Sequence, residues 1–462
     1  MDLNRVSSEV DVLIVGGGIV GCGILRDLAL NQRENGTNIK ILLVDKGDFN
    51  SQTSQGSSKM LHGGIRYLEN FDFSLVHEAL QEKNLWLKLA PHLCYEDSFH
   101  LPVYKSSKFP LFFIRLGMFL YDFLSHFKNS PHKILNKQKT LLKLPALNPD
   151  GLRGCGVYYD AIVDDAKLGL ECLYDALMED NVRAMNYTQV NSFKNEGDVS
   201  TVELEDTLTH NKKIIKARHV IFATGPFTDK LFEKLNIPWK PKLIPSKGIH
   251  LWLKPESINI KSPVVLQTKD DRVIFVIPQR GAILAGTTES IVTEEIYNIK
   301  PSESEIDYLL KEMAIYFPHA NLNRKNIISS FAAVRPLVKE DSGNDLGKTS
   351  RVHKIYYPYS NVEVIIGGKY TTFRIMAQDM SRIVMRKLGL PYHEALTLSP
   401  LRQHSVVETF SDTFISHEDL KAVLKKERVK TIDDLLRRRF GLIHPEHPRL
   451  KDIKDKVPGV FP

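Results

Sequence analysis

The beginning of the chain shows two apolar runs separated by a segment with helical periodicity. Residues 10–15 (VDVLIV) and 39–44 (IKILLV) are short and rich in β-branched residues, which is typical of buried parallel strands. The segment between them, IVGCGILRDLAL, has apolar residues at helical spacing. This order predicts a strand, a helix and a second strand in one βαβ unit.

A glycine turn joins the first strand to the helix. Gly16, Gly18 and Gly21 match the pattern GxGxxG, and Asp45 ends the second strand. The first glycine permits a tight turn, the second lets the backbone approach a pyrophosphate, and the third lets helix and strand pack closely. A carboxylate at the position of Asp45 accepts hydrogen bonds from ribose hydroxyls and disfavours a 2′-phosphate. The unit therefore predicts bound FAD or NAD rather than NADP.

Two later turns favour FAD. Residues 219–225 (HVIFATG) are another β-branched run that ends in small residues, which allows a close approach to a dinucleotide. Residues 362–374 (VEVIIGGKYTTFR) run from a strand into Gly367 and Gly368, and the following Thr-Thr pair can begin a helix. The amino end of such a helix would stabilise the negative charge of a reduced flavin. Because a glycine turn so far along the chain implies a discontinuous nucleotide domain, the pattern indicates FAD.

The rest of the chain predicts a second domain and a helical C-terminal region. Residues 245–335 alternate short strands with one helix, and charged helical patterns follow residue 395. The basic runs KKERVK and LLRRRF in that region are interpreted as a solvated helix face or as a contact with anionic lipid or a partner. The predicted FAD-binding domain comprises residues 1–82, 150–240 and 336–395, the substrate domain residues 83–149 and 241–335, and the C-terminal helical region residues 396–462.

Residues 109–124 form the most apolar stretch of the chain. Arg115 and Asp122 interrupt this stretch, which is too short to span a bilayer. The favoured interpretation is a helix packed inside the substrate domain, and the alternative is a helix lying in a membrane interface.

The composition of the 462 residues narrows the range of partners. Apolar residues make up 42% and charged residues 25%, the balance of an ordinary globular protein. The net charge of +7 suits an anionic substrate or an acidic membrane surface, whereas no basic stripe with interleaved aromatic residues indicates nucleic acid. The four cysteines are far apart, so we expect no disulfide framework, no metal site and a reducing compartment. The N-terminal apolar run continues straight into the glycine turn, so we expect no cleaved leader.

Several segments together resemble the FAD-dependent glycerol-3-phosphate dehydrogenases. They are GGGIVGCG, TSQGSSKMLHGGIRYLEN, YYDAIVDDAKL, ATGPFTDK, SKGIHLWL, AAVRPL and GGKYTTFR, and they occur in family order. The resemblance implies an α/β fold with a discontinuous FAD-binding domain of the glutathione-reductase type, a substrate domain on a mixed or antiparallel sheet, and a short C-terminal helical cap. It also implies oxidation of sn-glycerol 3-phosphate to dihydroxyacetone phosphate, with hydride transfer to FAD.

The resemblance and the chemistry of this reaction together assign roles to individual residues. Removing a hydride from a secondary alcohol requires a base for the hydroxyl proton and fixed cations for the phosphate. His250 and His62 are the candidate bases. Arg335 is a candidate for catalysis and for phosphate binding, because a charge in its apolar run needs an anionic partner, with an internal salt bridge as the alternative.

The remaining candidates fall into two groups. The substrate-binding candidates are Arg66, Tyr67, Arg335, Lys369 and Thr371, with Arg374 and Arg351 as weaker candidates for the phosphate. The cofactor-binding candidates are Gly16, Gly18, Ile19, Gly21, Asp45, Lys46, Ser57, Ser58, Lys59, His62, Gly63, Gly64, Ala223, Thr224, Gly225, Gly368, Lys369, Tyr370 and Thr371.

Alternatives stay open for the acceptor, the substrate and the location. A quinone is the favoured onward electron acceptor, and an oxidase that uses oxygen is the alternative. A related flavoprotein acting on another 2-hydroxy acid or an amino acid, and a flavin-binding protein without turnover, are the other hypotheses. We expect a cytoplasmic protein, with a peripheral contact on the inner face of the cytoplasmic membrane and a homodimer left open.

Overall fold

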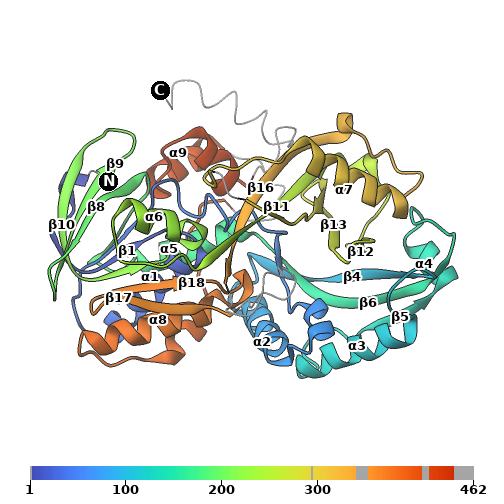
Figure 1. Cartoon of the computed structure of the whole chain (residues 1–462), viewed down its shortest axis with the longest axis horizontal. Helices are drawn as coiled ribbons and strands as arrows, with labels where there is room; N and C mark the ends of the chain where they lie inside the picture. The colour runs from blue at the N-terminus through green and yellow to red at the C-terminus, as the bar shows by residue number, and fades with distance from the viewer. Residues whose placement is uncertain (1–2, 293–294, 340–351, 408–415, 442–462) are drawn as a thin grey trace.

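The chain forms two lobes, each built on one β-sheet (Figure 1). The computed structural model describes residues 3–292, 295–339, 352–407 and 416–441. Strands near the N-terminus and strands from beyond residue 350 lie together in the left-hand lobe of Figure 1, so the first lobe is assembled from distant parts of the chain.

The sheet of the first lobe has a parallel centre. Its strands are β1 (Glu9–Val15), β2 (Ile41–Val44), β7 (Val182–Met185), β8 (Thr188–Asn195), β9 (Ser200–Asp206), β10 (Lys212–Phe222), β17 (Lys354–Tyr359) and β18 (Val362–Ile366). They lie in the main order β17-β18-β10-β1-β2-β7, and β8 and β9 are attached through β10. Every pair from β18 to β7 is parallel. The residues of β2 and β18 are all buried, as expected for strands covered on both faces.

Helices cover both faces of this sheet. One face packs against α1 (Ile19–Glu34), α5 (Asp165–Ala176) and α8 (Phe373–Lys387). The other face packs against α6 (Thr228–Lys234) and the apolar sides of β8 and β9. The predicted strand–helix–strand unit at the start of the chain is therefore present as β1, α1 and β2.

The sheet of the second lobe is mixed, as predicted. Its strands are β3 (Met60–Leu61), β4 (Cys94–Tyr104), β5 (Lys133–Asn136), β6 (Leu152–Val163), β11 (Leu243–Leu253), β12 (Val264–Gln267), β13 (Val273–Gln279), β14 (Ala282–Gly286), β15 (Ser290–Ile291) and β16 (Ile327–Val338). Only the β12–β4 pair is parallel among the described pairs of this sheet. The long strands β11 and β16 are antiparallel, with Ser246 opposite Arg335 and His250 opposite Phe331.

This second sheet is also covered on both faces. Its helices are α2 (Phe73–Leu89), α3 (Leu111–Leu124), α4 (Lys137–Lys143) and α7 (Glu303–Tyr316). Helix α7 packs against one face, whereas α2 and α3 pack against the other. Two strands in this sheet, β3 and β6, come from segments that the sequence analysis placed in the FAD-binding domain. β6 is buried along most of its length, so its apolar pattern resembles that of a parallel strand.

The most apolar helix of the chain is not packed inside the lobe. Helix α3 buries Met118, Tyr121 and Asp122, and it exposes the large side chains of the opposite stripe. These are Phe112, Phe113, Leu116, Phe119 and Phe123, each at least 51% exposed. The favoured sequence interpretation was therefore wrong, because periodicity reveals an apolar stripe but not which stripe faces the core. No helix in the described ranges combines the length and hydropathy needed to cross a bilayer.

The arginine run near the C-terminus is buried instead of solvated. The described C-terminal part contains α9 (His417–Lys426) and a π-helical turn, Asp434–Arg439. Arg438 and Arg439 are buried and form ion pairs with Asp48, whereas Arg437 is exposed. Neither a solvated face nor a lipid contact therefore describes this run. The four cysteines of the chain are all buried, with free thiols.

Candidate functional site

A cavity of about 530 Å³ runs between the two lobes. One end lies at the turn between β1 and α1, where Gly16, Gly18 and Ile19 line it. The other end lies at β11 and β16, where His250 and Arg335 line it. The cavity thus brings the predicted dinucleotide turn and the predicted catalytic residues into one continuous space.

The glycine turn is built so that only glycine fits. Gly16 has a φ of +108°, and a Cβ added there would lie 2.5 Å from the carbonyl oxygen of Ala223. The Gly17 amide donates a hydrogen bond to one carboxylate oxygen of Asp45 at 2.6 Å, and the Gly47 amide donates to the other at 2.8 Å. Burial raises the pKa of Asp45 to about 6 despite these two amides. Asp45 therefore holds the turn in place and also lines the cavity.

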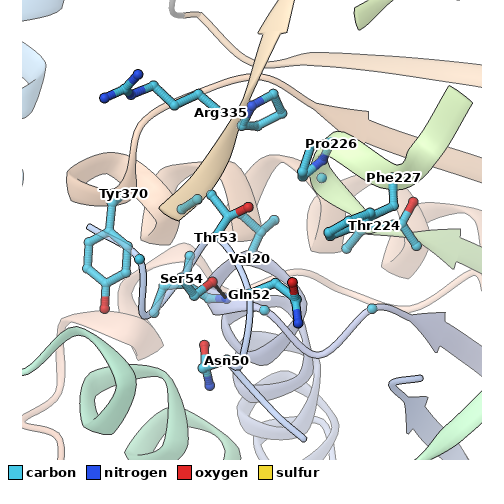
Figure 2. A pocket seen from close by; sticks show the side chains of 18 of the residues that line it. Val20, Asn50, Gln52, Thr53, Ser54, Thr224, Pro226, Phe227, Arg335 and Tyr370 are labelled. Carbon is cyan, nitrogen blue, oxygen red and sulfur yellow. Dashed lines mark hydrogen bonds between the residues drawn. The ribbon is translucent and has the colours of Figure 1, made fainter. Parts of the chain in front are cut away.

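A polar loop after β2 forms the wall next to this turn (Figure 2). The hydroxyl of Ser54 accepts a hydrogen bond from the Ile19 amide at 2.9 Å, and the Thr53 hydroxyl donates to the carbonyl of Val334 at 2.8 Å. The sequence analysis missed this loop, whose lining residues are Asn50, Ser51, Gln52, Thr53 and Ser54. Its signal was the polar run NSQTSQGSS directly after the βαβ unit.

Aromatic and cationic side chains surround the cavity near β10. The rings of Phe227 and Tyr297 have centroids 5.6 Å apart, and the ammonium of Lys46 lies 4.3 Å from the Tyr297 ring centroid. Thr224 lies on the same side, next to Phe227, in Figure 2. Lys46, Ala223, Thr224 and Gly225 were predicted here, whereas Phe227 and Tyr297 were missed. Phe227 belongs to the segment ATGPFTDK but was not selected from it, and Tyr297 belongs to none of the quoted segments.

His250 is held at the opposite end by a hydrogen bond and a ring stack. Its Nε2 atom lies 2.9 Å from the hydroxyl oxygen of Ser58, and its ring stacks on Phe331 with centroids 5.0 Å apart. The side chain is buried, and Nδ1 has no hydrogen-bond partner among the described residues. Burial, followed by the charges of Arg335 and Lys59, lowers the pKa of His250 to about 3. The imidazole is therefore neutral at ordinary pH.

Arg335 reaches into the same region from β16. Its guanidinium donates a hydrogen bond to the Thr287 hydroxyl at 2.9 Å, and longer ones to the Ser246 hydroxyl and the Thr288 carbonyl at 3.4 Å. Gly248 leaves room for the group, because a Cβ at Gly248 would meet the guanidinium directly. Figure 2 shows the Arg335 side chain extending away from Thr224 and Phe227.

A second cation lies near a tyrosine in this part of the cavity. The ammonium of Lys369 is 4.0 Å from the centroid of the Tyr67 ring, and both residues line the cavity. The His62 amide donates a hydrogen bond to the Thr371 hydroxyl at 3.2 Å. This bond joins the HGG loop, residues 62–64, to the turn before α8. His62 and Thr371 also line the cavity, together with Gly368 and Tyr370.

Several predicted site residues lie elsewhere. The ammonium of Lys59 is buried and bonds Asp165 at 2.7 Å, and the hydroxyl of Ser57 also donates to Asp165, although Ser57 still lines the cavity. The guanidinium of Arg66 donates to the backbone carbonyl of Asp271 at 2.7 Å and is not among the lining groups. Gly21, Gly63 and Gly64 lie behind the lining and shape the turns.

The weaker phosphate candidates are not supported. Arg374 on α8 forms a buried ion pair at 2.6 Å with Glu82 on α2, so its charge is compensated within the protein. Arg351 lies outside the described residues. Lys59, Arg66 and Arg374 share one reason for their displacement: each found a partner far away in sequence, which a local motif cannot reveal.

The HGG loop rests on a buried acid that the sequence analysis did not select. Asp160 on β6 accepts a hydrogen bond from the Tyr121 hydroxyl at 2.7 Å and one from the Gly63 amide at 3.3 Å. Burial raises the pKa of Asp160 to about 6. Because Tyr121 belongs to α3, this carboxyl group connects the exposed helix to the loop that carries His62.

These features fit a flavin dinucleotide. The glycine turn leaves no space for a side chain on the cavity wall, and α1 directs its amino end at the cavity from Gly18 onward. The polar loop residues, the strand end at Ala223 and the turn at Gly368 surround the same space. The lining of that space also includes a neutral imidazole and two cationic groups, those of His250, Arg335 and Lys369.

Comparisons with known proteins agree with this fit. The model of the FAD dependent oxidoreductase family matches residues 11–371. The chain is 35% identical over 406 residues to an aerobic glycerol-3-phosphate dehydrogenase of Staphylococcus aureus, covering 86% of this chain and 70% of the relative. It is 33% identical over 380 residues to the enzyme of that name from Bacillus subtilis, covering 82% of this chain and 67% of the relative.

Solved structures show the same relationship. The glycerol-3-phosphate dehydrogenase from Bacillus halodurans, complexed with FAD, is similar with a TM-score of 0.75 and 25% identity, covering 98% of this chain and 90% of that one. The L-alpha-glycerophosphate oxidase from Mycoplasma pneumoniae, with FAD bound, shares the fold, with a TM-score of 0.64 and 19% identity over 82% of this chain and 95% of that one. The predicted fold class and FAD dependence are confirmed. The chain belongs to the FAD-dependent oxidoreductase family and, within it, to the glycerol-3-phosphate dehydrogenases.

Proposed function

We propose that the chain oxidises sn-glycerol 3-phosphate to dihydroxyacetone phosphate. The observation that carries this proposal is that Arg335 and Lys369 line the same cavity as a buried, neutral His250. A phosphate ester with a neighbouring secondary alcohol needs both cations and a proton acceptor. The names of the relatives from Staphylococcus aureus and Bacillus subtilis agree with this substrate.

His250 is assigned the role of the base. Its Nε2 atom is the ring nitrogen that meets a hydroxyl, at 2.9 Å from Ser58, and Ser58 lines the cavity. In this proposal the substrate hydroxyl takes the donor position that Ser58 occupies, and Nε2 accepts its proton. Phe331 keeps the ring plane fixed during this transfer, because the two rings are nearly parallel at 11°. His62 stays the alternative base.

Arg335 and Lys369 are assigned to the phosphate. A phosphate monoester carries close to two negative charges near neutral pH. The planar guanidinium of Arg335 can pair with two phosphate oxygens. Tyr67 limits the positions of the Lys369 ammonium through the contact with its ring.

The residues that would hold FAD extend from the glycine turn to Thr371. They include Gly16, Gly18, Asp45, the polar loop residues and the turn at Gly368. FAD, when bound, supplies the hydride acceptor. The protein positions the alcohol carbon and removes the hydroxyl proton.

An anaerobic spectrum tests this function. Purified protein with bound FAD should lose its visible flavin absorbance within seconds of adding glycerol 3-phosphate, and retain it with glycerol, 2-hydroxyglutarate or sarcosine. Retained absorbance with glycerol 3-phosphate would refute the proposal. Loss of the flavin absorbance with sarcosine or 2-hydroxyglutarate instead would indicate that the protein oxidises amino acids or hydroxy acids.

A membrane quinone is the proposed onward electron acceptor. The exposed stripe of α3 presents large apolar side chains, and its surroundings are strongly basic. Residues 105–143 contain eight cations, Lys105, Lys108, Arg115, Lys128, Lys133, Lys137, Lys139 and Lys143, against one acid, the buried Asp122. Apolar residues beside basic ones suit the surface of an anionic bilayer. A peripheral contact there would give access to an acceptor dissolved in lipid.

Vesicle binding tests the membrane part of this proposal. Phe119→Glu with Phe123→Glu places two acids on the exposed stripe, so sedimentation with anionic vesicles should fall at least tenfold. The matched control is Leu208→Glu with Ile214→Glu, two exposed apolar residues of the first lobe, and it should bind vesicles like the parent protein. Equal binding by both variants would refute the assigned surface. Rapid oxygen consumption without a quinone would instead favour an oxidase.

A further inference from the structure

The C-terminal part of the described chain lies against the wall of the dinucleotide end of the cavity. Helix α9 and the π-helical turn Asp434–Arg439 form a small apolar core of their own, with Leu420, Val423, Leu435 and Phe440 buried in it. The turn also packs against α5 of the first lobe. The π-helical turn is therefore held by α9 through this apolar core and by α5 of the first lobe.

Two arginines from this turn converge on a single acid. Asp48 is 2% exposed and accepts hydrogen bonds from Nε of Arg438 at 2.5 Å and from Nη2 of Arg439 at 2.9 Å, with a further one from Nη1 of Arg439. Asn186 donates to Asp48 as well, at 2.9 Å. Burial alone would raise the pKa of Asp48, but Arg439 and Arg438 hold it below its ordinary value. The acid is thus charged and fully surrounded.

The same turn also contacts the far end of the polar loop. Arg438 donates through Nη1 to the side-chain oxygen of Gln55 at 3.2 Å. Asp48 and Gln55 bracket the loop, and residues 50–54 between them line the cavity. Within the bracket, the Asn50 amide donates to the Gly17 carbonyl at 2.9 Å and Ser54 accepts from the Ile19 amide. The loop is therefore held between the arginines on one side and the glycine turn on the other.

Arg438 and Arg439 each have further partners in the C-terminal part of the chain. Arg438 also pairs with Asp434 at 2.8 Å, and Arg439 donates through Nε to the carbonyl of Glu427 at 3.0 Å. Arg439 has no exposed surface, so removing its guanidinium leaves a buried carboxylate with a weaker partner set. Arg437, in contrast, is exposed and pairs with Asp433 at 2.9 Å. One run of three arginines thus supplies two buried contacts and one surface contact.

We propose that the turn Asp434–Arg439 is a latch that holds the loop of residues 48–55 against the glycine turn, and that Arg438 and Arg439 are positioning residues for FAD. The inference rests on the assignment of this cavity to FAD. The arginines do not reach the cavity themselves, because they are absent from its lining. They act through Asp48 and Gln55, whose loop supplies the polar groups beside the helix terminus where a pyrophosphate would bind.

The test measures FAD binding to the full-length apoprotein. Arg439→Gln should raise the dissociation constant for FAD at least tenfold and speed FAD release, as followed by flavin fluorescence. Arg437→Gln is the matched control from the same run and should stay within twofold of the parent protein. Arg439→Lys keeps the charge but not the forked contact, so its dissociation constant for FAD should lie between those of Arg439→Gln and Arg437→Gln.

Urea unfolding of the apoproteins separates positioning from general stability. A lowered unfolding midpoint for Arg439→Gln with an FAD dissociation constant within twofold of the parent would overturn the proposal. If Arg439→Gln does not fold, Gln55→Ala is the second variant, because it removes the loop contact of Arg438, together with the hydrogen bond from Gln55 to the Ser51 carbonyl, without leaving a buried charge. Gln55→Ala should weaken FAD binding at least threefold, and an unchanged constant would overturn the latch. No substrate is present in these titrations, so failure to oxidise glycerol 3-phosphate leaves their outcome unaffected.

Discussion

Replacing Arg335 by glutamine gives the sharpest test of the proposed phosphate site. Glutamine keeps a donor for the Thr287 hydroxyl but removes the charge and the forked geometry. Hydrogen bonds to charged groups contribute about 1.5–3 kcal/mol each, so losing a bidentate pair costs about 3 kcal/mol after partial replacement. At 1.4 kcal/mol per factor of ten, the Michaelis constant for glycerol 3-phosphate should rise roughly 100-fold.

The rate at saturating substrate should change much less. Arg335 is one of the charges that lower the pKa of His250, so its removal raises that pKa and strengthens the base. Anaerobic stopped-flow measurement of flavin reduction over a range of substrate concentrations separates the two effects. Arg382→Gln, which alters an exposed ion pair on α8, is the control and should leave both constants unchanged. A Michaelis constant within threefold of the parent value would remove Arg335 from the phosphate site.

Three further predictions address the base, its charge and a structural ion pair. His250→Asn should slow flavin reduction by about 10²–10⁴ while substrate affinity stays within a few fold, and if only His62→Asn slows it, the base is His62. The pKa of His250 is lowered from 6.5 to about 3 in the folded protein. Between these two values only the unfolded chain takes up the proton, so the free energy of unfolding decreases as the pH falls. Urea unfolding between pH 6 and 5 gives the slope of the free energy of unfolding against pH. This slope should be about 1.4 kcal/mol per pH unit smaller in His250→Asn than in the parent protein, and equal slopes would contradict a neutral His250. Arg374→Gln should lower the free energy of unfolding by about 3–5 kcal/mol by leaving Glu82 buried without its partner, and a raised Michaelis constant without destabilisation would restore Arg374 to the substrate site.

The nucleotide-binding part of the site could be predicted because its signals are local. The strand before Gly16, the helix after Gly18 and the acid ending β2 all follow from short patterns with a known geometry. The polar loop after β2 was missed, although it lies next to these residues in sequence. Its composition indicates a loop, but only the contact of Ser54 with the Ile19 amide shows that it faces the cavity.

Charged residues were harder to place than glycines. Lys59 and Arg374 look like ligands of an anion in their local context, but their partners are Asp165 and Glu82, distant in sequence. The arginine run LLRRRF was misjudged for the same reason, since Asp48 precedes it by 390 residues. Helix α3 was misjudged because an apolar stripe specifies an amphipathic helix without specifying the medium that it meets.

The alternation of the chain between the two sheets has a consequence for folding. β18 pairs in parallel with β10, yet the second sheet supplies six strands, β11–β16, between them in sequence. Until residues 362–366 are available, residues 220–222 of β10 have no partner strand on the edge opposite β1, and this end is exposed to pairing with another chain. Such distant closure slows folding and lengthens the lifetime of aggregation-prone intermediates. A fragment that ends before β18 should therefore accumulate in insoluble form, even though it contains the complete glycine turn.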